Sequence, residues 1–425
     1  MFSLREDRDL VSRNNETGGE VADAGLYRWV VYSVFITCNT AGFLIANTIG
    51  ILLPSITNDI SLSPTEQGIL SSAPFWANLM LMVVVSWWTS RYRPKILVSV
   101  TILMGSIFLF VQGWAPTFLA LFLGRLAFGV TMIAREPARS LLIRQWLPRR
   151  EINMAGGISN LFFGIIVSGG LLLTPVILNY FNGDWRPTIN LGGVLFLCLG
   201  VVWHFVGKDR SIALVDVSEP TPTRASEFSL LRKVFSFREV WIAGVGFTGA
   251  MMAFFSFNSF FPTMALDHYD ISISSSGLII AMYVLPGGFS GVLLAYYTKG
   301  VKGREVILVL AGFIIGGTYF GMTLVDNYTF LIGLAILNGM GWGFFPILYM
   351  VPFYLKGVQP REIAIAGAVV MSLGHLGSVF GPMVTGYMQE TIGSLQISMR
   401  IISLAPITLV LSAFLLRYQK LRDLK

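Results

Sequence analysis

The sequence predicts an all-α membrane protein with twelve transmembrane helices, arranged as two six-helix bundles that repeat one another. Three observations support this fold: the length of the apolar runs, the placement of the basic residues, and an internal repeat. The composition agrees, because 54% of the 425 residues are hydrophobic and only 12% are charged. A water-soluble chain of this length needs more charged side chains on its surface, so the lipid bilayer is expected to cover most of the outside.

Twelve apolar runs are long enough to cross a bilayer. A hydrocarbon core about 30 Å thick needs roughly 17 to 25 residues at the helical rise of about 1.5 Å per residue. The predicted spans cover residues 30–54, 68–88, 96–114, 117–134, 155–181, 187–205, 240–262, 277–297, 306–324, 330–355, 363–388 and 401–416. The first 28 residues are polar and mixed in charge, unlike a signal peptide, so the first span is expected to remain in the mature protein.

The basic residues gather in alternate gaps between these spans. Of the 30 Lys and Arg residues, 27 lie in the two tails or in every second gap; Arg186 and Arg400 lie in other gaps, and Arg125 lies within a span. Because basic loops stay on the cytoplasmic side, both termini are predicted to be cytoplasmic, in the cell (inner) membrane. This placement accounts for the net charge of +7, so no nucleic-acid partner is predicted.

The chain divides into two halves around a polar stretch that contains prolines, hydroxyl side chains and most of the central charge. The predicted organisation is a cytoplasmic tail (1–28), a six-helix bundle (29–206), a cytoplasmic linker (207–238), a second six-helix bundle (239–417) and a short cytoplasmic tail (418–425).

A sequence repeat relates the two halves. The segment with Leu62 and Gly68 recurs 209 residues later with Ile271 and Gly277. Such a parallel repeat of six helices is typical of carriers that rock about a site at the middle of the membrane.

Several motifs resemble those of the major facilitator superfamily. The matching elements are an R-x-x-x-G motif at Arg125 and Gly129, a W-x-P-x-x-E loop at Trp146, Pro148 and Glu151, and a G-W-R-like element at Asp184, Trp185 and Arg186. The spacing from Arg125 to Trp146 is similar to that of the organic anion (anion:cation) symporter branch. The resemblance implies a secondary transporter. The family's loop between spans two and three has Ser86 and Ser90 here in place of its glycine and aspartate, so the salt bridge attributed to that aspartate is not expected.

Arg125 is a candidate for both substrate binding and proton coupling. A guanidinium within a span costs about 2.5 to 3.5 kcal/mol on insertion scales, so it should face a polar cavity or a partner. In a cavity, its planar fork can hold a carboxylate through two hydrogen bonds. The alternative is a structural arginine that bonds backbone carbonyls and side chains of span one such as Asn39 or Asn47.

His375 is the second candidate for proton coupling. An imidazole with a pKa near 6.5 can take up a proton at ordinary pH if it faces the cavity; the alternative is a histidine bonded to a neighbouring helix. Near the cytoplasmic surface, Glu136 could pair with Arg91 or Arg93 as a gate, or form an exposed ion pair worth at most about 1 kcal/mol.

Uncharged polar residues within spans are candidates for a substrate site at the middle of the membrane, although some of them should only hold helices together. The residues we assign to substrate binding besides Arg125 are Asn39, Asn258, Tyr283 and Asn338.

These features predict a secondary active transporter and not an enzyme. The sequence has no phosphate-binding loop, no H-E-x-x-H and no G-x-S-x-G, and its two cysteines lie in spans, so neither a cofactor nor a metal is predicted. The expected substrate is a small organic anion, a carboxylate, moved together with protons by alternating access, because no acidic residue lies deep in a span to attract a cation. The alternatives are an exporter of neutral or amphipathic compounds, and a sensor or assembly factor that transports nothing. The oligomeric state is not predicted.

Overall fold

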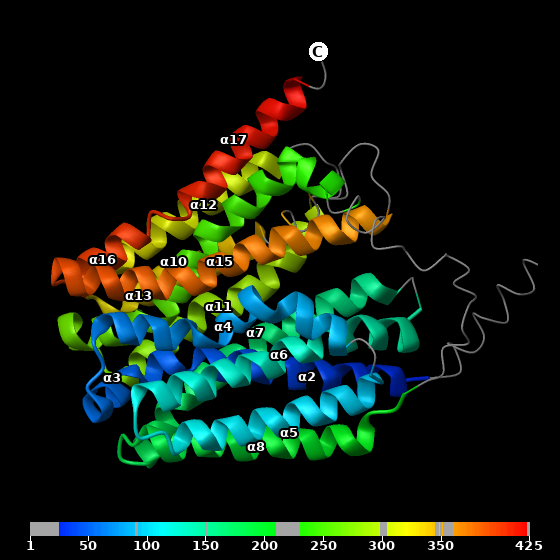
Figure 1. Ribbon diagram of the computed structural model, residues 1–425. Coiled ribbons are helices and arrows are strands. Elements are labelled where there is room, and N and C mark those ends of the chain that lie inside the picture. Colours follow the sequence, from blue (N-terminus) through cyan, green and yellow to red (C-terminus); the bar gives the residue numbers. More distant parts are fainter. Residues whose placement is uncertain are drawn as a thin grey trace, which may run out of the picture.

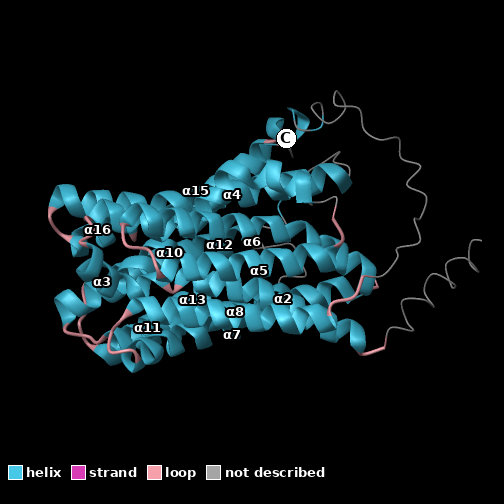
Figure 2. Ribbon diagram, turned by 60° about the horizontal axis from the view of Figure 1, so that its bottom comes forward, coloured by secondary structure: helices cyan, strands magenta, loops and turns pink. Residues whose placement is uncertain are grey.

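The computed structural model describes residues 25–89, 92–148, 151–209, 230, 232–297, 304–344, 348, 351 and 360–422, and within them it contains helices and no strands. Figures 1 and 2 show most of these helices running side by side, with connections at both ends. The predicted tail (1–28) is described only from residue 25, and most of the predicted linker, residues 210–229, lies outside the described residues.

The first half of the chain supplies one bundle. Its helices are α2 (Tyr27–Asn47), α3 (Ile49–Ile60), α4 (Pro64–Thr89), α5 (Pro94–Gly113), α6 (Phe118–Trp146), α7 (Ile152–Tyr180) and α8 (Trp185–Val206). Together α2 and α3 form the first predicted span, which breaks at Thr48. The fourth predicted span, 117–134, corresponds to the longer helix α6.

The second half supplies the other bundle. Its helices are α10 (Arg238–Tyr269), α11 (Ile273–Tyr297), α12 (Arg304–Met322), α13 (Tyr328–Gly341), the 3₁₀ turn η2 (Trp342–Phe344), α15 (Pro360–Ile392), α16 (Leu395–Ile402) and α17 (Ile407–Arg422). Ten candidate spans in the described residues are long and apolar enough to cross a membrane, and Tyr328–Phe344 is a shorter apolar helix.

The helices give the molecule two ends, which we name the termini end and the hairpin end. At the termini end the chain enters α2 and leaves α17, and the hydroxyl of Tyr27 donates to the carbonyl of Val206, 2.7 Å away. At the hairpin end lie the short turns that follow α3, α5, α7, α10, α12 and α15. Helices that start there are capped by side-chain oxygens of Thr117, Asn327 and Ser394, which accept the free N–H groups of the first turn.

The apolar core has two parts that interlock where the bundles meet. One part is formed mostly by the first half of the chain but includes Phe255 and Val379 from the second half. The other is formed mostly by the second half but includes Val167 and Leu171 from α7. The surface between the halves is therefore packed with side chains from both bundles.

Candidate functional site

The two halves meet most closely at the hairpin end. A Cβ atom on Gly68 of α4 would overlap the carbonyl of Pro382 in α15, and one on Gly386 of α15 would overlap the carbonyl of Pro64. Only glycine lets the two backbones come this close. Thr65 also donates its hydroxyl proton to the carboxylate of Glu390 across the same seam.

A second seam joins α7 to α11. The hydroxyl of Ser168 donates to the carbonyl of Ala281 at 3.1 Å, and the amide of Asn179 donates to the hydroxyl of Ser274 at 3.1 Å. A Cβ on Gly277 would lie 3.0 Å from the carbonyl of Leu171. Gly68 and Gly277, which the sequence repeat relates, thus hold equivalent places in the two seams.

The break between α2 and α3 exposes backbone carbonyls near the centre of the bundle. The N–H groups of Ile51 and Leu52 both bond to the carbonyl of Thr48, at 3.1 and 3.3 Å. The three preceding carbonyls accept from side chains instead: Ile45 from the Thr48 hydroxyl, Ala46 from Arg125, and Asn47 from Asn258. An interrupted helix of this kind at mid-membrane is a recurring feature of transporter sites.

A hydrogen-bond network crosses from one half to the other at this break. The side-chain amide of Asn258 in α10 donates to the side-chain oxygen of Asn47 at 2.7 Å, and the hydroxyl of Tyr283 in α11 donates to the oxygen of Asn258 at 3.2 Å. All three side chains are buried. Two of the residues predicted to bind substrate, Asn258 and Tyr283, are therefore brought together, and Asn47 joins them.

An aromatic layer lies one helical turn from this network, on the side of the termini end. We use this name for a set of rings in successive contact, with centroids 4.5 to 6.2 Å apart: Phe43, Phe75, Phe163, Phe254, Phe255, Tyr283 and Trp342. Both halves contribute to it, so the layer must rearrange if the halves separate.

Asn39 lies beyond this layer, toward the termini end, whereas His375 lies at the level of the layer itself. Asn39 shares a face of α2 with Phe43 and Asn47, because these residues are four apart. The contacts of Pro382 and Gly386 with α4 set a register that places His375 level with Phe75. Both polar side chains are partly exposed, and neither has a hydrogen-bond partner among the described residues.

Arg125 lies inside the first bundle. Its Nε donates to the carbonyl of Leu70 and its Nη2 to the carbonyl of Ala46, both at 2.9 Å, and only 3% of the side chain is exposed. These contacts match the structural alternative raised for it above, whereas a contact with substrate stays a prediction. Arg135, one of the basic residues that flank Glu136, is also fully buried; it donates to the carbonyl of Cys38 and lies over the ring of Phe196.

The remaining predicted site residues lie apart from the network. Asn338 is buried in the second bundle, where it donates to the hydroxyl of Thr318 at 2.8 Å. Of the predicted gate, Arg93 is exposed before α5, whereas Arg91 and the side chain of Glu136 lie outside the described residues. The gate therefore stays a prediction.

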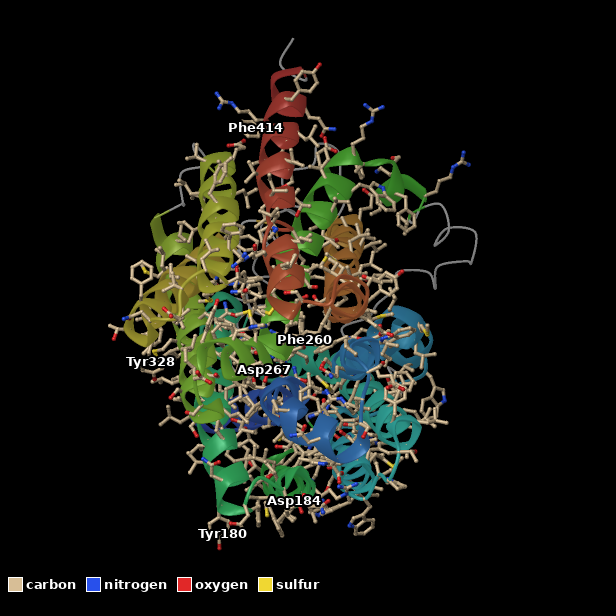
Figure 3. The ribbon with its side chains drawn as sticks, turned by 90° about the vertical axis from the view of Figure 1, so that its left-hand side faces the viewer. Tyr180, Asp184, Phe260, Asp267, Tyr328 and Phe414 are labelled. Atoms are coloured by element: carbon tan, nitrogen blue, oxygen red, sulfur yellow. The ribbon has the colours of Figure 1, made fainter. Side chains whose placement is uncertain are left out.

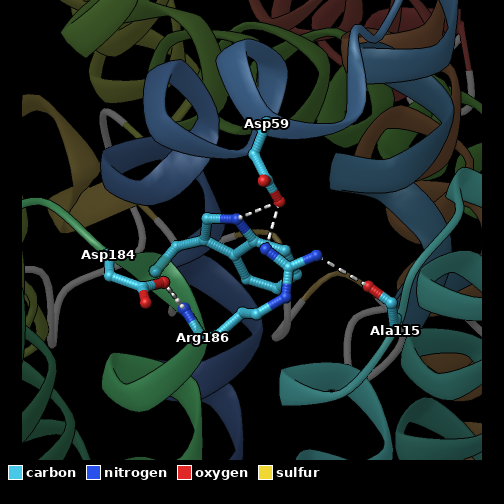
Figure 4. Close-up of polar contacts among 5 residues, drawn as sticks. Asp59, Ala115, Asp184 and Arg186 are labelled. Carbon is cyan, nitrogen blue, oxygen red and sulfur yellow. Dashed lines mark hydrogen bonds and ion pairs between the residues drawn. The ribbon is translucent and has the colours of Figure 1, made fainter.

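The G-W-R-like element ties helices together at the hairpin end. Figure 4 shows Arg186 paired with Asp59 at the end of α3 and donating to the carbonyl of Ala115 at 3.2 Å, while Asp184 caps the start of α8. Figure 3, viewed from this end, shows Phe260 near the middle, where the two halves meet.

The comparison with known families decides which kind of protein carries this arrangement. Residues 34–382 match the model of the Major Facilitator Superfamily. The chain belongs to this superfamily. The predicted fold of twelve transmembrane helices in two bundles is thereby confirmed, and so is the prediction of a secondary transporter rather than an enzyme.

Individual relatives and solved structures agree. A probable galactarate/D-glucarate transporter of Escherichia coli (strain K12) is 22% identical over 407 residues, covering 86% of this chain and 89% of the relative. A nitrite extrusion protein of Bacillus subtilis (strain 168) is 24% identical over 371 residues, with 85% and 88% covered. A bacterial homolog of the human lysosomal transporter Spinster, in an inward-facing, occupied conformation, has the same fold, with a TM-score of 0.76, 17% identity, and coverage of 94% and 98%.

Proposed function

We propose that this transporter moves a small organic anion, coupled to protons, by alternating access. The relatives named for galactarate, D-glucarate and nitrite support an anionic substrate. The chemistry near the middle of the interface agrees, because the polar side chains named there, Asn39, Asn47, Asn258, Tyr283 and His375, are amides, a phenol and an imidazole. A carboxylate accepts hydrogen bonds from all of these groups.

In this proposal, polar residues on both sides of the aromatic layer form the substrate site. Asn39 offers an amide that has no hydrogen-bond partner among the described residues, and Asn258 and Tyr283 become available when the cross-half network opens. Arg125 acts from behind the site, because it holds the carbonyl of Ala46, next to Asn47. A direct contact between Arg125 and the substrate requires the guanidinium to leave its two carbonyls.

His375 is the proposed carrier of the proton. Its face of α15 packs on α4, and the flanking helices α4, α10 and α16 carry charges only near their ends, such as Glu66, Glu239 and Arg400. A protonated imidazole therefore has no nearby carboxylate on these helices, so a bound substrate anion would stabilise it. Loading the proton and the anion together follows from this electrostatic coupling.

The proposed mechanism is supported most directly by the positions of the contacts between the two halves. The hydrogen bonds described between them, from Thr65, Ser168, Asn179 and Asn258, lie at the hairpin end or near the middle. The described ion pairs at the termini end, Arg28–Glu151 and Lys233–Glu362, each join helices of one half. This is the pattern of a carrier closed at one end, and alternating access requires the hairpin-end contacts to break and re-form.

The test is uptake of radiolabelled D-glucarate into liposomes that contain the purified protein, with and without an inward proton gradient. We expect the gradient to accelerate uptake, and His375→Gln to remove this dependence on pH. If the wild-type protein takes up D-glucarate at the same rate with and without the gradient, proton coupling is contradicted. Transport of lipophilic dyes but of no organic acid would favour the exporter of amphipathic compounds instead.

A further inference from the structure

A cavity opens on the side of the first bundle, away from the surface between the halves. It has a volume of about 270 Å³ and is lined by residues of α2, α3, α5, α6, α7 and α8; we call it the lateral cavity. Leu173 of α7 and Leu195 of α8 both line it and are more than half exposed. The cavity therefore reaches the outer surface of the bundle between these two helices, where the bilayer lies.

Within the described ranges, Nη1 of the Arg125 guanidinium has no hydrogen-bond acceptor in this cavity. Arg125 lines it, and the two hydrogen bonds of the side chain use only Nε and Nη2. In the part of the chain that the structure describes, no carboxylate forms an ion pair with Arg125. A buried guanidinium is always charged, and an uncompensated charge favours an anion at Nη1.

The polarity of the lining changes along the cavity. The polar residues Gln112, Thr174 and Thr188 lie in the part near the hairpin end, together with Arg125, and Thr48 lies near the middle. Thr37 lines the far part, but its hydroxyl donates to the carbonyl of Ser33 in its own helix. From Thr188 to the apolar Leu199, α8 extends about 16 Å at a rise of about 1.5 Å per residue. The lining thus runs from polar to apolar in the direction in which a lipid of the nearer leaflet points its chain.

We propose that the lateral cavity binds a single-chain carboxylate from the bilayer, with the carboxylate on Nη1 of Arg125 and the acyl chain along α8. The cavity opens on a different side of the bundle from the proposed transport site, and the proposal does not depend on that site, although Arg125 also holds the carbonyl of Ala46 behind it. A carboxylate matches the charge and the hydrogen-bonding groups of the polar part, and an unbranched chain matches the apolar part.

A second cavity of similar size provides an internal contrast. It has a volume of about 270 Å³ and is lined by Leu285, Pro286, Phe289, Ser290 and Met340 of α11 and α13. None of these side chains is charged, so this cavity offers no site for a carboxylate. The arginine distinguishes the lateral cavity, and a binding experiment can use that difference.

The experiment measures equilibrium binding of radiolabelled decanoate to the purified full-length protein in an uncharged detergent. Gly192 lines the cavity and has open space where a Cβ would be built, so Gly192→Leu fills the cavity without a backbone clash. Gly169 on α7 has the same open space but does not line the cavity, which makes Gly169→Leu the matched control.

We expect wild-type protein and Gly169→Leu to bind decanoate alike, and Gly192→Leu to bind it at least about tenfold more weakly, a loss of about 1.4 kcal/mol. Excess 1-decanol, which lacks the carboxylate, should displace little decanoate, and D-glucarate should displace none. Equal binding by Gly192→Leu, equal competition by decanol, or no binding by the wild type would each overturn the proposal. Arg125→Gln should lose binding too, but the outcome does not depend on that variant, because Arg125 also holds two helices together.

Discussion

The two seams between the halves achieve the same contact in different ways. In the α4–α15 seam the two backbones are so close that only glycine fits at positions 68 and 386. Both glycines lie within the turns nearest the hairpin end. The α7–α11 seam combines looser glycine contacts with hydrogen bonds. Its contacts extend from Asn179 back to Asn160, whose carbonyl would lie 3.0 Å from a Cβ on Gly288. The first seam should therefore tolerate no added atom, whereas the second should accept small changes.

The largest expected effect comes from Gly68→Ala. The added methyl group overlaps the carbonyl of Pro382, so α4 and α15 must separate, at the cost of about 1 to 3 kcal/mol typical of overpacked sites. We expect D-glucarate uptake to fall at least about fivefold, since 1 kcal/mol already changes a population by roughly that factor.

Gly164→Ala is the matched control for that substitution. It adds the same methyl group to a helix at the other seam, where the nearest atom is the carbonyl of Leu285 at 3.5 Å, an ordinary contact. Uptake should stay near the wild-type rate. If both alanine variants transport equally well, the difference between the seams has no functional meaning.

An intermediate effect is expected from Gly277→Ala, the repeat-related position. Its Cβ would lie 2.7 Å from Cγ of Pro175, a ring atom that moves by a change of ring pucker, and 3.0 Å from the carbonyl of Leu171, whereas a Cβ on Gly68 would lie 2.3 Å from the carbonyl of Pro382. Uptake should fall less than for Gly68→Ala, measured side by side in the same liposomes. A larger loss for Gly277→Ala would reverse the ranking of the seams.

A smaller effect is expected where the network crosses the middle of the interface. Asn258→Ala removes the hydrogen bonds to Asn47, and such bonds between membrane helices average about 0.6 kcal/mol, or about threefold in a population. Cysteine labelling at the hairpin end should show a modest rise in accessibility. A double-mutant cycle with Asn47→Ala that gives no coupling energy would contradict a role for the pair.

The smallest effect is expected from Glu390→Gln at the hairpin-end surface. The exposed hydrogen bond from Thr65 to Glu390 contributes at most about 1 kcal/mol, and a neutral amide oxygen still accepts it. Uptake and thermal stability should remain within about 0.5 kcal/mol of wild type, as for most surface substitutions. A severe loss would mean that this contact, and not the glycine packing, holds the first seam.

The general fold could be predicted from the sequence because each of its signals is local. Apolar run length defines a span, and the repeat of Gly68 at Gly277 identified positions that the structure places in equivalent seams. The break at Thr48 gave no such signal, because the apolar run continues through it and the nearest glycine and proline, Gly50 and Pro54, lie within α3. The groups that hold its carbonyls, Arg125 and Asn258, lie 79 and 211 residues further along the chain.

The candidate site was predicted only in part, for a related reason. Asn258 and Tyr283 were identified as polar residues in apolar spans, and that rarity is visible in the sequence. The aromatic layer was not, because a helix that is apolar all round gives no sign of which phenylalanine faces the other half. Phe43 and Phe255 resemble lipid-facing residues until the rotation of each helix is known.

The central claim, that the halves part at the hairpin end during each transport cycle, is tested most directly by a reversible cross-link across the α7–α11 seam. Asn179 and Ser274 already touch there, so Asn179→Cys with Ser274→Cys, in a chain whose Cys38 and Cys198 are replaced by serine, should form a disulfide on oxidation. We expect oxidation to stop D-glucarate uptake and reduction to restore it, with each single-cysteine variant unaffected. Uptake at the full rate by the cross-linked protein would contradict the account.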